Sequence, residues 1–99
     1  MAQVTEEQKA HYARSVTRAK ALLRRGDKVR LTICGGGQAT YVFADWDGEW
    51  MVSKSGVNEL HPYNVVRLNG KPLSFRDENH RVVSTLIQER KAEATHVEA

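Results

Sequence analysis

Closely spaced turn signals between Gly26 and Phe75 constrain the fold of this chain more than any other feature of its sequence. Asp-Gly and Asn-Gly pairs favour tight hairpins, because these residues accept the positive φ angles that such turns require. Pro62 excludes an ordinary central strand around its position, since proline cannot donate to the hydrogen-bond ladder. The sequence therefore predicts short antiparallel strands joined by the turns Gly35-Gly36-Gly37-Gln38, Asp45-Trp46-Asp47-Gly48, Ser55-Gly56 and Asn69-Gly70.

The extended runs between these turns fit a five-stranded antiparallel barrel. In the first run, Val29, Leu31 and Ile33 alternate with polar residues, which is typical of a half-buried strand. Turns at this spacing occur in sandwiches and barrels, and the short length of the segment favours the barrel. We predict a small β-barrel over residues 28–73, with strands at 28–34, 39–44, 49–53, 57–60 and 65–68 and a short return at 71–73.

A basic amphipathic helix is predicted over residues 5–25, before the barrel. Thr5 is a suitable N-cap, and Gln8 stands where a capping box requires it. Gly26 is a typical helix stop. We expect the helix to dock one side on the barrel through the apolar residues that recur at helical spacing, which are Tyr12, Val16, Ala19 and Leu23.

A second helix is predicted over residues 75–93, after the barrel. Ser74 is expected to cap it, with Asp77 as the second member of a capping box. The helix carries an apolar stripe that either packs onto the barrel or forms a homodimer. The residues of this stripe are Val82, Val83, Leu86 and Ile87. Together these elements predict one α+β domain spanning residues 1–99.

Three short motifs resemble the Src-homology-3 (SH3-like) barrel. They are Asp47-Gly48-Glu49-Trp50, the turn at 53–56, and Pro62-Tyr63-Asn64-Val65. The resemblance covers residues 28–73 and implies a groove for proline-rich peptides, flanked by a hairpin and a helical turn. It also implies that Trp50 is the groove tryptophan and that Pro62 is the proline of the turn. Shape alone does not decide function, because such barrels also bind nucleic acids or dock inside larger assemblies.

The excess positive charge of the chain lies in its N-terminal segment. The net charge is +3, and residues 1–25 carry six basic against two acidic side chains. Residues 26–73 carry five of each, so the predicted barrel is neutral in sum. Basic side chains gathered on one helix face either contact nucleic-acid phosphates or form a solvated surface. We expect a non-catalytic module that binds DNA or RNA through Arg14, Arg18, Lys20, Arg24 and Arg25.

The alternative is a protein-interaction or inhibitor module, of the kind found among small accessory or mobile-element proteins. Tryptophan and tyrosine anchors carry much of the energy at protein interfaces. Acidic neighbours would suit a basic partner segment. The surface predicted for this function consists of Trp46, Trp50, Pro62 and Tyr63 with Asp45, Asp47 and Glu49. Burial of the two tryptophans in the barrel core is the opposing interpretation, and the sequence leaves both open.

No motif in the sequence indicates catalysis, a metal or a cofactor. Cys34 is the last residue of the first predicted strand and has no neighbouring base, and the histidines show no metal-ligand spacing. No apolar run approaches the roughly 20 residues of a membrane-spanning helix, and the N-terminus lacks the pattern of a signal peptide. We therefore expect a non-enzymatic protein of the cytoplasm that does not bind membranes.

Overall fold

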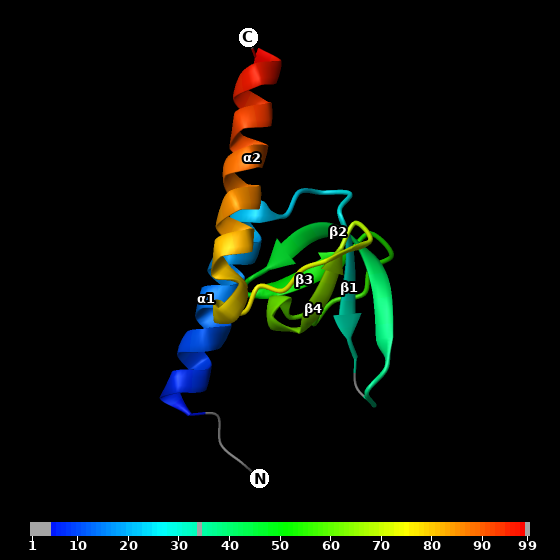
Figure 1. Cartoon of the computed structure of the whole chain (residues 1–99). Coiled ribbons are helices and arrows are strands. Elements are labelled where there is room, and N and C mark those ends of the chain that lie inside the picture. The colour runs from blue at the N-terminus through cyan, green and yellow to red at the C-terminus, as the bar shows by residue number, and fades with distance from the viewer. Residues whose placement is uncertain (1–4, 34, 99) are drawn as a thin grey trace.

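Figure 1 shows the computed structural model, in which two helices lie on one side of an antiparallel sheet. The structure describes residues 5–33 and 35–98. The class is α+β, as predicted. The main elements, in chain order, are α1 (Glu6–Leu22), β1 (Lys28–Thr32), β2 (Gln38–Asp47), β3 (Trp50–Ser53), β4 (Val65–Leu68), β5 (Lys71–Pro72) and α2 (His80–Glu98). Two short 3-10 helices, η1 (Pro62–Asn64) and η2 (Asp77–Asn79), precede β4 and α2.

The sheet is open, so the prediction of a closed barrel is wrong. Its strand order is β3-β2-β1-β4-β5, and neighbouring strands are antiparallel. The strand predicted at 57–60 does not form, because Glu59 has a positive φ of 62° and only Leu60 bridges to Met51. The fifth strand is instead the short return β5, which contains Pro72 and cannot continue the ladder.

The hairpin between β2 and β3 separates the two tryptophans. β2 extends to Asp47, so the turn consists of Gly48 and Glu49 and is shorter than predicted. Trp46 pairs with the buried Met51, and Asp47 pairs with Trp50. Paired residues share a face of the sheet and adjacent residues lie on opposite faces. Trp46 therefore lies on the core face, and Trp50 on the other.

The capping box predicted for the first helix is confirmed. The Gln8 amide donates to the Thr5 hydroxyl at 3.1 Å, and the Thr5 amide donates to the Gln8 side chain at 3.2 Å. The helix ends at Leu22, earlier than the predicted stop at Gly26. Leu23 takes an extended conformation and is buried in the core, and the next amide, that of Arg24, donates to a carboxylate outside the helix.

The second helix begins later than predicted. The η2 turn precedes α2, and the Ser74 hydroxyl accepts from the amide of Arg76 at 3.2 Å. The predicted capping box with Asp77 is not formed, because the Asp77 carboxylate instead binds side chains of α1. In the apolar stripe, Val83 is fully buried, and Leu86 and Ile87 pack against the core. Among the stripe residues this leaves mainly Val82 exposed for a dimer interface, and the homodimer stays a prediction.

One buried cluster joins both helices to the sheet. It includes Ala19 and Leu22 of α1, Leu31 of β1, Met51 of β3 and Val83 of α2. Figure 1 shows α2 continuing past the sheet toward the C-terminus. Neither helix, over the residues described, has the length and apolar character needed to cross a membrane.

Candidate functional site

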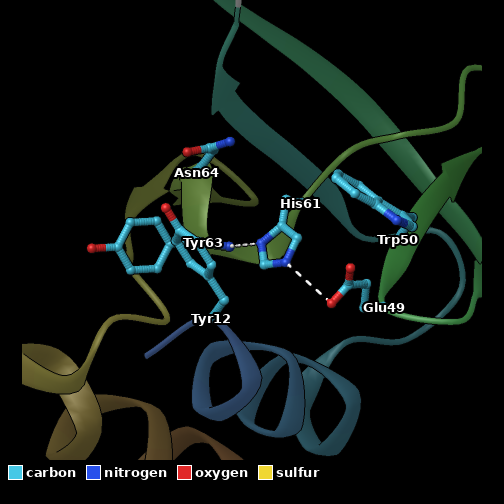
Figure 2. A pocket seen from close by; sticks show the side chains of 6 residues that line it. All are labelled: Tyr12, Glu49, Trp50, His61, Tyr63 and Asn64. Carbon is cyan, nitrogen blue, oxygen red and sulfur yellow. Dashed lines mark hydrogen bonds and ion pairs between the residues drawn. The ribbon is translucent and has the colours of Figure 1, made fainter. Parts of the chain in front are cut away.

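An open groove lies where α1, the β2–β3 turn and η1 meet (Figure 2). Its volume is about 420 Å³. We call it the aromatic groove, and its lining residues are Tyr12, Glu49, Trp50, His61, Tyr63 and Asn64. These residues come from three segments that are distant in sequence, so the groove depends on the tertiary fold.

The η1 turn positions one wall of the groove. His61 caps it, and its ring Nδ1 accepts a hydrogen bond from the amide of Tyr63 at 3.1 Å. Pro62 occupies the first position of the turn, where a missing amide donor costs nothing, and it is fully buried. The turn therefore fixes the backbone from which Tyr63 and Asn64 reach the groove.

The aromatic rings of the groove contact one another edge to face. The ring centres of Tyr12 and Tyr63 are 4.8 Å apart, and those of Trp50 and His61 are 5.1 Å apart. Tyr12 also meets His61 at 5.5 Å, so the histidine ring lies between the tyrosine and the tryptophan. Such contacts favour a defined ring arrangement. Trp50 remains 37% exposed at the end of this row.

The groove has an acidic edge. The Glu49 carboxylate lies 3.9 Å from His61 Nε2. Burial lowers the pKa of His61, and Glu49 opposes this shift only in part. The imidazole is therefore neutral at pH 7, and because Nδ1 accepts from Tyr63, the remaining proton is placed on Nε2, facing Glu49. A neutral histidine leaves the negative charge of Glu49 uncancelled.

Arg76 contacts one of the tyrosines that line the groove. The Arg76 guanidinium lies over the Tyr63 ring, 4.1 Å from its centre, and its Nε donates to the Tyr63 carbonyl at 3.1 Å. These two contacts hold the tyrosine ring in place, which reduces the entropy lost when a ligand packs against it.

Some of the predicted protein-binding residues line the groove, and the others lie elsewhere in the fold. Trp50, Tyr63 and Glu49 line it, and Pro62 is buried in the turn that supports it. Trp46 instead packs against the core, with its ring 5.2 Å from that of Phe43.

The remaining two predicted acids, Asp45 and Asp47, are exposed on β2, and the Asp45 carboxylate accepts from the neighbouring backbone amide.

Three residues that line the groove were not among the predicted protein-binding residues. Tyr12 was assigned to the packing stripe, Asn64 was named only as part of the motif Pro62-Tyr63-Asn64-Val65, and His61 was considered only as a base or a metal ligand.

Two of the predicted nucleic-acid contacts bind a carboxylate within the protein. Arg14 donates to both oxygens of Asp77 at 2.9 and 2.7 Å. Arg18 lies 2.8 Å from the same carboxylate and donates to the Phe75 carbonyl at 3.0 Å. His11 also contacts Asp77. The hydrogen bonds from Arg14, and then those from Arg18, hold the pKa of Asp77 far below its ordinary range.

The other predicted contacts are held in different ways. Arg24 donates to the Arg90 carbonyl at 2.9 Å and pairs with Glu93 at 3.7 Å. Lys20 lies over the Trp46 ring at 5.4 Å. Arg25 lies beyond the end of α1 and is exposed, and no contact joins its guanidinium to another residue that the structure describes. Cys34 lies outside the described residues.

No protein-family model, curated protein or solved structure matches this chain. The Src-homology-3 resemblance therefore rests on the three sequence motifs alone.

Proposed function

We propose that this protein is a non-catalytic protein-binding module that holds a peptide segment of its partner in the aromatic groove. The observation that carries the proposal is the exposed Trp50 ring at the end of a row of packed aromatic side chains, beside the uncancelled charge of Glu49. Aromatic side chains in a preformed hollow provide apolar contact area at a low cost in entropy.

The chemistry of the groove defines the segment that would fit. Its volume of about 420 Å³ lies within the range of about 300–1,000 Å³ typical of ligand pockets. The rings would pack against an apolar side chain, while Glu49 would pair with a lysine or arginine of the partner. The Asn64 amide and the tyrosine hydroxyls are suited to hydrogen-bonding an extended backbone. The expected ligand is an apolar residue next to a basic one.

The groove residues suit binding better than catalysis. The lining described above includes no serine, threonine, cysteine or lysine that His61 would activate as a nucleophile. The Nδ1 atom of His61 is already occupied by the Tyr63 amide. We assign His61 a supporting role, in which its ring spaces Tyr12 from Trp50.

The resemblance to Src-homology-3 domains agrees with this proposal, because the motifs that carry it include Trp50 and the Pro62 turn. We infer a related arrangement in an open sheet, serving a small accessory or inhibitory protein of the cytoplasm. In Src-homology-3 domains a tyrosine is expected after the asparagine of this turn, whereas this chain has Val65; here Tyr12 of α1 supplies a tyrosine to the groove instead.

A displayed library of random peptides tests the proposal without a known partner. We expect the wild-type protein to enrich peptides with an apolar residue beside lysine or arginine. Trp50→Ala should abolish the enrichment while leaving the circular dichroism spectrum intact, and Glu49→Gln should remove only the preference for the basic residue. Val82→Ala truncates another exposed apolar side chain, on α2, and is the matched control. Equal enrichment by wild type and Trp50→Ala would reject the proposal.

A further inference from the structure

Basic side chains are concentrated on the part of the exposed sheet face where β1 pairs with β4. The net charge of residues 26–73 is zero, but Asp45 and Asp47 lie in the part of β2 that pairs with β3, beyond the part that pairs with β1. Of the acids, Asp27 is buried and paired with Arg90, and Glu49 lines the aromatic groove. Three of the bases, in contrast, line a hollow on the sheet. It has a volume of about 190 Å³, and its lining residues are Lys28, Arg30, Thr40, Arg67 and Gly70.

Strand geometry brings these bases together. Lys28 and Arg30 alternate with the buried residues of β1, so they lie on the face opposite the core. Arg30 is directly opposite Arg67 of β4 on one side and Thr40 of β2 on the other. We call Lys28, Arg30 and Arg67 the basic face.

In the part of the chain that the structure describes, the cations of the basic face form no ion pair with an acidic side chain. Arg30 Nε donates to the Gln38 side-chain oxygen at 2.8 Å, and Arg67 Nη1 donates to the Gly70 carbonyl at 3.1 Å. Both acceptors are uncharged, and no carboxylate among the described residues pairs with any of the three cations. Like charges directly opposite each other destabilise a sheet, so the Arg30–Arg67 pair lowers the stability of the fold.

We propose that the basic face binds the phosphate backbone of a nucleic acid. Each guanidinium keeps donors that its uncharged acceptor does not use, and arginine is well suited to phosphate. The hollow is smaller than the pockets of about 300 Å³ or more that enclose small ligands. It is large enough to receive one phosphate group of a chain that lies across an open face. Thr40 adds a hydroxyl donor, as often occurs in contacts to the backbone.

This site differs from the one predicted from sequence and from the aromatic groove. It uses β1 and β4, whereas the predicted site used α1 and its C-terminal end. Backbone contacts of this type carry no base specificity, so binding should depend strongly on salt and weakly on sequence. Because the groove residues are not involved, either site can fail its test without affecting the other.

Fluorescence anisotropy with labelled oligonucleotides tests the proposal. The full chain is titrated into single-stranded DNA, duplex DNA and an RNA hairpin at about 50 mM and about 200 mM salt. We expect binding at low salt that weakens as salt rises. Arg30→Gln with Arg67→Gln should lower the affinity about tenfold at low salt and reduce the slope of log K against log salt by roughly two.

The matched control removes the same charge from the helix side. Lys9→Gln with Arg25→Gln changes two exposed bases that lie outside the basic face, and Arg25 is also a contact of the predicted helix site. We expect this pair to retain most of the affinity and slope. Equal losses in both double variants, no binding at low salt, or equally tight binding of poly-glutamate would each overturn the proposal.

Discussion

The arginines on the two sides of the sheet have different partners. On the helix side, Arg14 and Arg18 share the carboxylate of Asp77, and Arg90 pairs with Asp27. On the basic face, Arg30 and Arg67 donate to uncharged acceptors and to no carboxylate among the residues that the structure describes. The count of basic residues along a segment therefore does not identify a binding surface. The location of the carboxylates does, because they decide which cations are already paired.

The largest effect on the free energy of unfolding is expected when an arginine on the helix side is removed. Arg90 Nη1 lies 2.7 Å from Asp27 and donates to the Leu22 carbonyl at 2.7 Å, which ties α2 to the end of α1. Arg90→Ala leaves Asp27 buried without its cation. We expect a loss of about 3 kcal/mol in the free energy of unfolding, measured by urea denaturation.

Arg81→Ala is the control for this experiment, because it truncates an exposed arginine on the same helix. Its effect should stay within about 0.5 kcal/mol. Similar losses from both variants would show that helix content, and not the pair with Asp27, causes the change.

The sequence predicted the parts of the fold that depend on local chemistry. The capping box at Thr5 and the hairpin glycine at Gly48 follow from backbone requirements that neighbouring residues satisfy. The closed barrel failed because the positive φ of Glu59 and the shortness of β5 are set by the tertiary structure. Periodicity alone does not encode such positions.

The candidate sites were only partly predictable for the same reason. Trp50 and Tyr63 were found through short motifs. Tyr12 reaches the groove from a helix about 40 residues away, which only the fold reveals. The basic face was missed because the charge was summed along the chain, whereas Arg30 and Arg67 become neighbours by strand pairing.

A pH series should show the next largest effect, again on the helix side. Hydrogen bonds from Arg14 and Arg18 lower the pKa of Asp77 in the folded state below its ordinary value of 3.8. The folded state then binds fewer protons than the unfolded state, so Asp77 stabilises the fold at neutral pH. This contribution is lost as the pH falls through 3.8 toward the folded pKa.

Asp77→Asn removes this pH-dependent contribution to stability. It should be less destabilising at neutral pH than Arg90→Ala, since Asp77 and Arg14 are partly exposed. The pH dependence of unfolding in acid should also become shallower, with a remainder from Asp27, whose pKa is lowered as well. For Asp27, burial acts to raise the pKa, but hydrogen bonds from Arg90 and the Arg24 amide outweigh it. An unchanged pH profile in Asp77→Asn would show that its ion pairs are weak in solution.

The smallest effect, and the one of opposite sign, is expected on the basic face. Arg30→Gln with Arg67→Gln removes two like charges that face each other across β1 and β4. Relief of this repulsion should raise the free energy of unfolding by about 0.5 kcal/mol at low salt, and added salt should abolish the gain because it screens exposed charges. Thermal unfolding at two salt concentrations measures both. A loss of stability would mean that the two arginines serve the fold itself, and the contrast with the helix side would then disappear.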